Sequence, residues 1–176
     1  PDGDNGESPD PSVTYRAWDQ TDGNSEGTKV DVSTNGDPTA YSTATDTASI
    51  AVASVNDAPV LDNSGAMVLT NVAEDTAGPA GDSVGAIVAS AGGDRITDVD
   101  AGAVEGFAVT GVDDTNGTWQ YKVGAAPWTA FGVVSDASAV LLDTAALIRF
   151  VPDPDYTGTA GSLSFRAWDT TDANPS

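Results

Sequence analysis

The residues of this sequence best suited to chemistry are acidic side chains that recur near expected strand ends and in one acidic turn. The turn Asp98-Val99-Asp100 presents two carboxylates on the same side of the chain, and Asn56-Asp57 adds an amide and a third carboxylate. Calcium takes about six to eight oxygen ligands from carboxylates, amide carbonyls and backbone carbonyls. The pattern therefore predicts calcium binding, and the candidate ligands are Asn56, Asp57, Glu74, Asp75, Asp98, Asp100, Asp169 and Asp172.

Each of these acidic residues also has a local explanation. An Asp in a turn commonly accepts hydrogen bonds from its own backbone, with no metal involved. Glu74-Asp75 follows an expected strand, and Asp169 and Asp172 cap another. Any one of them can be a turn cap, whereas the set at the joint, together with the charge of the chain, favours at least one calcium ion.

The charge of the chain excludes several classes of partner. The sequence has 27 acidic and 6 basic residues among 176, a formal net charge of −21. Nothing here can neutralise phosphates, so nucleic acid is not an expected partner, and anionic membrane surfaces would repel the chain. No apolar run of about 18 residues is present, so direct membrane insertion is not expected. The charge either aids solvation or is partly offset by bound cations.

The absence of Cys and His removes most catalytic and metal chemistry. Disulfides are excluded, zinc and copper sites lose their usual ligands, and nucleophile pairs of the Ser/His or Cys/His kind cannot form. Paired carboxylates can hydrolyse glycosides, but with 27 acidic residues some pair will have that spacing by chance. Self-cleavage at Asp-Pro bonds such as Asp153-Pro154 competes with the ordinary use of this dipeptide in turns. We therefore expect no enzyme.

The elements that must position the acidic residues include one stretch that occurs twice. Ser12–Asp19 (SVTYRAWD) returns as Ser162–Asp169 (SLSFRAWD), 150 positions later. A repeat of this length is a domain-sized unit rather than one coil of a solenoid. The chain is therefore expected to hold the end of one repeat, a joint and most of the next, seen out of register.

Short strands separated by turns are expected along the whole chain. Apolar and polar residues alternate in residues 12–19, and residues 47–55 form a second strand that we expect to pair with them as a long-looped hairpin. No window shows a sustained helical period. Many short strands at this spacing predict an all-β fold of the β-sandwich type. After the joint the expected strands are 66–72, 83–90, 106–112, 118–123, 128–134, 139–142, 146–151 and 162–168.

The joint lies at Val55–Leu61, where Pro59 restricts the backbone and makes a taut linker. This divides the chain into residues 1–57, the C-terminal hairpin of one repeat, and residues 58–176, most of the next sandwich. The counterpart of 47–55 in the second repeat falls beyond residue 176. We therefore expect the hairpin to fill that gap, either within one chain or by strand exchange with a neighbouring copy.

Several motifs together resemble one family. They are the joint Val55–Val60, Ala73-Glu74-Asp75, Ile96–Gly102, Gly117–Tyr121 followed by Trp128-x-x-Phe131, Ile148–Pro152 and Phe165–Asp169. The set resembles the cadherin-like or immunoglobulin-like tandem repeats of very large bacterial surface adhesins, including secreted adhesins of the RTX type. The resemblance covers essentially the whole chain.

The resemblance implies a Greek-key sandwich on the bacterial cell surface, strung in series with adjacent repeats and stiffened by calcium. It places Asn56 and Asp57 in the linker site, Asp98 and Asp100 in the Asp-x-Asp element, and Asp169 at the late strand end; Glu74 and Asp75 follow only by proximity in the pattern. The expected function is a non-catalytic extender in adhesion or biofilm cohesion. The alternative is a module that binds glycan or protein directly, which would need an open cleft of aromatic and acidic side chains.

Overall fold

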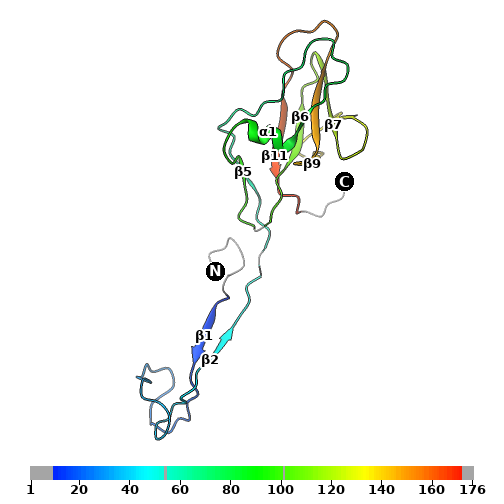
Figure 1. Cartoon of the computed structure of the whole chain (residues 1–176). Coiled ribbons are helices and arrows are strands. Elements are labelled where there is room, and N and C mark those ends of the chain that lie inside the picture. Colours follow the sequence, from blue (N-terminus) through cyan, green and yellow to red (C-terminus); the bar gives the residue numbers. More distant parts are fainter. Residues whose placement is uncertain (1–9, 54, 101, 172–176) are drawn as a thin grey trace. The chain divides into compact units, whose positions relative to one another are not determined.

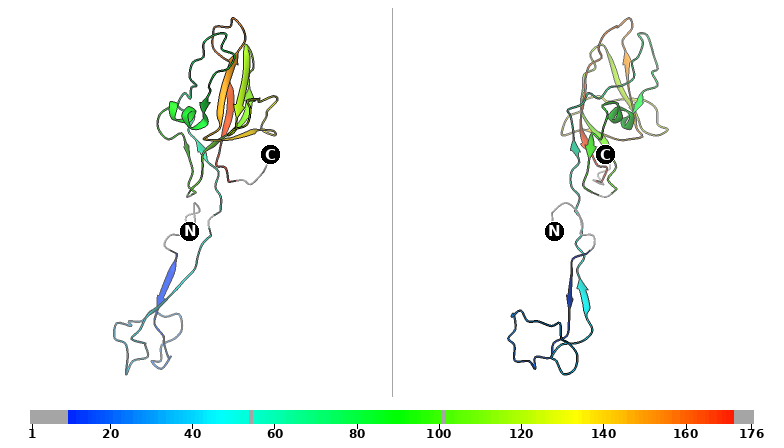
Figure 2. Two further views of the ribbon diagram at one scale, coloured as in Figure 1. Left: turned by 45° about the vertical axis from the view of Figure 1, so that its right-hand side comes forward. Right: turned by 60° about the vertical axis from the view of Figure 1, so that its left-hand side comes forward.

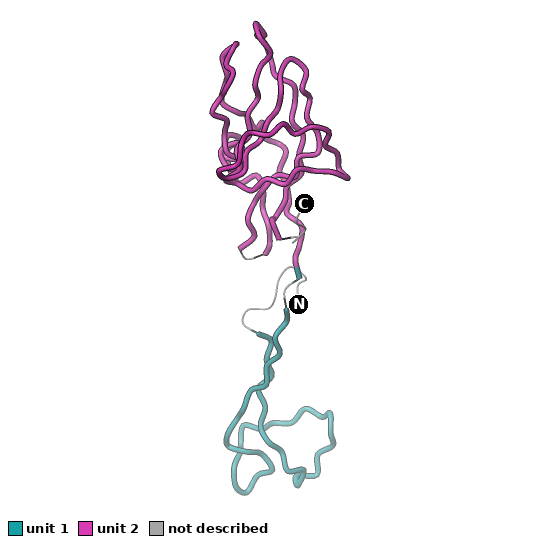
Figure 3. Tube along the Cα trace, turned by 90° about the vertical axis from the view of Figure 1, so that its right-hand side faces the viewer, with its two compact units in different colours: residues 1–55 teal, residues 56–176 magenta. Residues whose placement is uncertain are grey.

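A computed structural model describes residues 10–53, 55–100 and 102–171. Its internal contacts separate the chain into two compact units, Pro1–Val55 and Asn56–Ser176 (Figure 3). This division falls two residues before the boundary that the sequence predicts between residues 57 and 58.

Unit 1 is built on one antiparallel hairpin (Figure 1). Strand β1 (Ser12–Tyr15) pairs with β2 (Asp46–Ser49), with Ser12 opposite Ser49 and Tyr15 opposite Asp46. The pairing resumes at a bridge between Trp18 and Tyr41. The predicted long-looped hairpin is therefore confirmed. The sequence predicts a half-buried strand, but both strands are exposed at every position because a two-stranded ribbon has no second layer to pack against.

Unit 2 is composed mostly of antiparallel strands, which confirms the predicted all-β class (Figures 1 and 2). One sheet has the order β4-β10-β7-β8, the second β11-β6-β9, and a short pair joins β3 to β5. The bounds are β3 (Val60–Leu61), β4 (Asp82–Ser83), β5 (Ile96–Thr97), β6 (Gly106–Val112), β7 (Gly117–Lys122), β8 (Thr129–Ala130), β9 (Val140–Asp143), β10 (Leu147–Pro152) and β11 (Leu163–Trp168).

Side chains from both larger sheets meet in one core. Phe107 of β6 is fully buried and stacks on Phe165 of β11, with ring centroids 3.7 Å apart. From the other sheet, Trp119 of β7 packs against Phe150 of β10, 5.2 Å between centroids. Alternate residues of β10 are buried, as a strand with one face on a core requires. The buried hydrophobic residues of unit 2 are Val84, Ile87, Val88, Ile96, Phe107, Val109, Trp119, Phe131, Leu142, Ala146, Ile148 and Phe150.

One predicted strand is wrong. In the expected strand 83–90, only Ser83 belongs to a strand, β4, and Val84–Ser90 form helix α1. Ser83 caps it, since its side chain accepts a hydrogen bond of 3.1 Å from the backbone N–H of Ala86. Val84, Ile87 and Val88 are buried, at the i, i+3, i+4 spacing of one helix face. This short, apolar, Ala-rich stretch fits both the two-residue period of a strand and the 3.6-residue period of a helix, so its pattern could not distinguish the two.

Other expected strands are shorter or absent. No strand forms over 66–72, and 128–134 contributes only β8. The short strands β3, β4 and β5 have too few residues to show a period in sequence. The remaining expected strands after the joint appear within about two residues of their predicted bounds.

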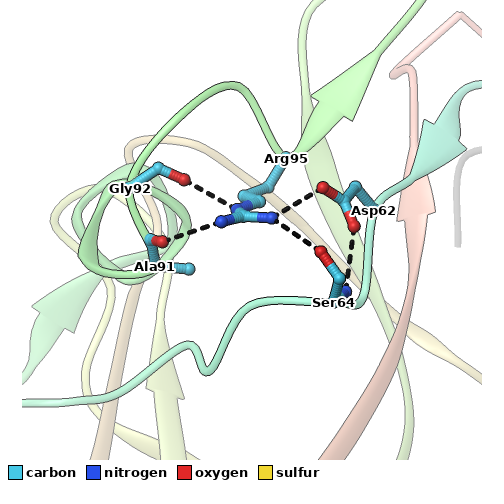
Figure 4. A network of polar contacts seen from close by, with 5 residues as sticks. All are labelled: Asp62, Ser64, Ala91, Gly92 and Arg95. Carbon is cyan, nitrogen blue, oxygen red and sulfur yellow. Dashed lines mark hydrogen bonds and ion pairs between the residues drawn. The ribbon is translucent and has the colours of Figure 1, made fainter.

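Arg95 ties the end of α1 to the chain that follows β3 (Figure 4). Its guanidinium donates to the carbonyl oxygens of Gly92, at 2.7 Å, and Ala91, at 3.0 Å. It also donates to Asp62 Oδ2 at 2.6 Å and to Ser64 Oγ at 3.1 Å. Cations at a helix C-terminus satisfy its unpaired carbonyls. Because Arg95 immediately precedes β5, this network also anchors the β3–β5 pair.

Candidate functional site

The pair β3–β5 brings two of the predicted acidic segments together. Val60 lies opposite Thr97 and Leu61 opposite Ile96 in this antiparallel pair. Continuing the same register towards lower residue numbers on β3 places Asp57 opposite Asp100. The backbone N–H of Asp57 indeed donates a 2.7 Å hydrogen bond to Asp100 Oδ2. Residues 56–57 and the Asp98–Asp100 turn are therefore neighbours, although about forty residues separate them in sequence.

The end of β11 supplies the third segment. Asp169 directly follows Trp168, the last residue of β11, and its Oδ2 accepts a 2.9 Å hydrogen bond from Asn56 Nδ2. Its Oδ1 accepts from the backbone N–H of Thr171 at 3.0 Å. Thr171 Oγ1 in turn donates to Asn56 Oδ1 at 2.5 Å. We call Asn56, Asp57, Asp98, Asp100 and Asp169 the joint cluster.

Asp169 is the buried member of the joint cluster. Its exposed fraction is 5%, and among the residues that the structure describes it is the one charged side chain that is buried. Burial, the largest single effect, acts to raise the pKa of Asp169, but the hydrogen bonds from Thr171 and Asn56 together outweigh it and the pKa lies below its ordinary value. Asp169 is therefore an anion held in place by donors on two separate segments.

One carboxylate oxygen of Asp98 is buried and receives no hydrogen bond from the described residues. Its Oδ1 accepts a 2.8 Å hydrogen bond from the backbone N–H of Asp100. Its Oδ2 is buried and has no hydrogen-bond partner among the residues that the structure describes. A buried carboxylate oxygen without a donor is costly, because the charge loses water without compensation. A cation beside this oxygen would remove that cost.

The other predicted ligands lie elsewhere. The loop that carries Asp155 joins β10 to the first residue of β11, whereas Asp169 follows the last residue of β11. Asp75 Oδ1 accepts a hydrogen bond of 3.0 Å from the backbone N–H of Asp155, so Glu74-Asp75 lies at the opposite end of β11 from Asp169. Asp172 lies outside the described residues. The structure thus brings together five of the eight predicted ligands.

Turn capping accounts for part of the joint cluster. The Oδ1 atoms of Asp98 and Asp169 each accept from the backbone N–H two residues on, the local pattern of an Asx turn. Within the described ranges, no group of three or more acidic side chains is arranged as a ready metal site. Asp98 Oδ2 is the buried oxygen of the joint cluster for which the described residues supply no hydrogen-bond donor.

Sequence reasoning missed Thr171. Its hydroxyl and backbone N–H both contact the joint cluster. The signal was present in the repeat, because Asp19-x-Thr21 in the first copy has the same spacing as Asp169-x-Thr171. In that copy Asp19 Oδ1 likewise accepts from the backbone N–H of Thr21, at 2.9 Å. The two turns therefore share this hydrogen bond, although the Thr21 hydroxyl donates to Asp19 and the Thr171 hydroxyl to Asn56.

Unit 1 contains a separate polar site around Asp22. The indole N–H of Trp18 donates to Asp22 Oδ1 at 3.0 Å, and the hydroxyl of Tyr41 donates to Asp22 Oδ2. The hydrogen bond from Tyr41 is the largest cause that lowers the pKa of Asp22 to about 2. Beside these residues lies an open cavity of about 440 Å³, whose lining includes Tyr15, Trp18 and Tyr41.

Comparison with known proteins adds no identity. No family model, no curated protein and no solved structure matches the chain. Among the described residues, no helix has the length and apolar character needed to cross a bilayer.

Proposed function

We propose that this chain is a non-catalytic, extracellular tandem-repeat module of a large bacterial adhesin and acts as a calcium-stiffened extender in adhesion or biofilm formation. We further propose that unit 2 is a Greek-key sandwich of the immunoglobulin or cadherin type. The observation that carries the calcium proposal is the joint cluster. Three segments far apart in sequence meet where the chain enters unit 2, and four of the five side chains are carboxylates.

The donor set suits a hard cation. Carboxylates and an amide carbonyl are the ligands that calcium prefers, and the cluster contains no nitrogen or sulfur ligand of the kind that zinc selects. Asp98 Oδ2 is buried without a hydrogen-bond partner among the described residues, and Asp169 is held as an anion. The ligand types therefore suit calcium, and binding would have to draw these carboxylates closer together than the described residues hold them.

Calcium would supply the positive charge that the joint cluster lacks. The carboxylates of the joint cluster repel one another, and this repulsion grows where water is excluded from between them. Bound calcium would cancel this repulsion and hold residues 56–57 to the turn Asp98–Asp100 and to the end of β11. The segment at which the chain enters unit 2 would then lose freedom, which is what an extender requires.

Thermal unfolding of paired variants tests this function. We expect calcium, titrated from a chelator, to raise the unfolding midpoint of unit 2 and to saturate at about 10⁻⁴–10⁻³ M, the range of extracellular modules. Asp98→Asn should abolish most of the rise. Asp75→Asn, at the opposite end of β11, is the matched control and should leave it intact. A flat response of the unsubstituted chain, or an equal loss in both variants, would rule out the site.

A second candidate function is direct binding of a glycan or protein by unit 1. The observation that favours it is the open cavity beside Tyr15, Trp18 and Tyr41, with Glu26 also in its lining. Aromatic faces next to acidic groups suit sugar rings, since they combine apolar contact with hydrogen bonding. Titration of neutral oligosaccharides while observing the indole N–H signal of Trp18 tests this function; an unchanged signal across the series would remove it.

A further inference from the structure

The inner strands of the four-stranded sheet lie in parts of the chain that have no acidic residue. Residues 115–135, which include β7 and β8, contain no Asp or Glu, and neither do residues 144–152, which include β10. The first run is the longest of its kind in a sequence with 27 acidic residues among 176. In β4, both carboxylate oxygens of Asp82 accept hydrogen bonds from Thr70. Strands β7, β8 and β10 therefore lack the negative charge that is found elsewhere in the chain.

One face of β7 and β10 is turned away from the core and carries two cations. Trp119 of β7 and Ile148 of β10 are buried in the core. Side chains alternate along a strand, so Gln120, Lys122 and Arg149 lie on the opposite face, where each is partly exposed. Gln120 is directly opposite Arg149. Lys122 is the diagonal neighbour of Arg149, a relationship that separates two residues by about 7–8 Å.

Trp128 lies on the same face. Continuing the β7–β8 register places it opposite Lys122. The guanidinium carbon of Arg149 is 4.2 Å from the centroid of the Trp128 ring. Arg149 Nε also donates to Gln120 Oε1 at 2.8 Å, and its Nη1 donates to the carbonyl oxygen of Pro79 at 3.1 Å. Stacking on an aromatic ring and two acceptors hold the guanidinium in one orientation. We call Gln120, Lys122, Trp128 and Arg149 the basic face.

The cations of the basic face have no carboxylate partner among the described residues. The other two cations of unit 2 each form an ion pair, Arg95 at 2.6 Å and Arg166 at 2.9 Å. Neither Lys122 nor Arg149 takes part in an ion pair within the described ranges. Carboxylates are abundant in a chain of net charge −21. Two cations on a face without any of them favour an anionic ligand from outside the chain.

We propose that the basic face binds a carboxylated saccharide, such as a chain of uronic acid units. Lys122 and Arg149 bind its carboxylates through charge-assisted hydrogen bonds. The ring of Trp128 packs against the apolar face of a sugar ring, and this contact favours a saccharide over an acidic peptide. The proposal does not rest on calcium, since the joint cluster lies beside the β3–β5 pair and at the end of β11.

Titration with a short oligogalacturonate tests the proposal, and a neutral oligogalactose of equal length is the control ligand. A chelator keeps calcium from bridging carboxylates. Salt at about 0.15 M, where the Debye length is about 8 Å, screens the repulsion by distant acidic residues. We expect the indole N–H signal of Trp128 and the amide signals of β7 and β10 to shift. The acidic ligand should bind at least about tenfold more tightly than the neutral one. No binding, or equal affinity for both ligands, would overturn the proposal.

Two variants separate local contacts from net charge. Lys122→Gln removes one cation of the basic face without disturbing the stack of Arg149 on Trp128, so it should fold. Arg166→Gln is the matched control, because it removes the same charge from an exposed ion pair in the other sheet. We expect Lys122→Gln to weaken oligogalacturonate binding by about three- to tenfold and Arg166→Gln by less than about twofold. An equal loss in both variants would overturn the site, since net charge alone would then govern binding.

A last comparison distinguishes a saccharide from an acidic protein segment. An oligoglutamate carries similar carboxylates but has no sugar ring to pack on Trp128. We expect it to bind more weakly than the oligogalacturonate. Tighter binding of the oligoglutamate, or dimerisation of the chain that Lys122→Gln abolishes, would assign the basic face to acidic protein segments and overturn the saccharide.

Discussion

The backbone N–H of Asp57 donates a 2.7 Å hydrogen bond to Oδ2 of Asp100, 43 residues away in sequence. The two residues lie opposite each other in the continued β3–β5 register, and this side-chain bond joins the linker to the acidic turn. Asn56 makes the equivalent connection to Asp169 at the end of β11. The first two residues of unit 2, Asn56 and Asp57, are therefore both held by hydrogen bonds to carboxylates.

Replacing Asp169 should destabilise unit 2. Asp169→Asn keeps the volume of the side chain but replaces one carboxylate oxygen with an NH₂ group. That group would face either the amide of Asn56 or the backbone N–H of Thr171, and both are donors. A buried donor left facing a donor costs about 1–3 kcal/mol. Chemical denaturation of the calcium-free chain measures the change. Asp136→Asn, which removes an exposed ion pair, should change stability by less than about 1 kcal/mol. Equal effects would contradict the role of Asp169.

Acid should weaken unit 2 through the same residue. The pKa of Asp169 is lowered in the folded chain, so the folded state favours the anion. The stability it contributes is present above the unfolded pKa of about 3.9 and is lost as pH falls through the lower folded value. Unfolding free energy measured from pH 5 downwards should fall below about pH 4. The unfolding free energy of Asp169→Asn should fall less steeply below about pH 4 than that of the unsubstituted chain. Parallel curves for the two chains would show that other acidic groups cause the loss of stability.

Helix α1 should depend on its cap. Ser83→Ala removes the acceptor for the N–H of Ala86 and should cost about 1 kcal/mol, within the range of 0.5–2 for such caps. The exposed Ser138 offers a matched Ser→Ala control in unit 2. Denaturation midpoints of the two variants give the comparison, and a cost no greater than that of the control would show that packing alone holds the helix.

Tyr41 should set the acidity of Asp22 in unit 1. Tyr41→Phe removes the hydroxyl that donates to Asp22 Oδ2, the largest cause of its pKa of about 2. We expect the pKa of Asp22 to rise towards about 3.9, the value of an unperturbed Asp. Titration of the carboxyl carbon signal by NMR measures it. Asp31, whose pKa is lowered by Ser33 rather than by Tyr41, should titrate as before. An unchanged Asp22 would disprove the hydrogen bond.

The sequence correctly predicted the strands whose alternation of apolar and polar residues matches the side chains that they bury. Strands β6, β7, β10 and β11 alternate clearly, and alternation in residues 12–19 correctly indicated the strand that pairs with β2 in a hairpin. Helix α1 was missed because its apolar residues fit both a helix and a strand. Asn56, Asp98, Asp100 and Asp169 were grouped through the resemblance to cadherin-like repeats, whereas Glu74-Asp75 was assigned only by proximity in that pattern. Which end of β11 an acidic turn occupies depends on strand register, which residue types do not encode.

The most direct measurement of the central claim is a calcium titration followed through the backbone amide signals of the whole chain. We predict that signals of residues 56–57, 98–100 and 169–171 shift together and saturate near 10⁻³ M calcium. Those of Asp75 and Asp155 should stay in place, and magnesium at the same concentration should have a much smaller effect. Shifts spread evenly over all acidic residues, or none at the joint cluster, would contradict a calcium site at the start of unit 2.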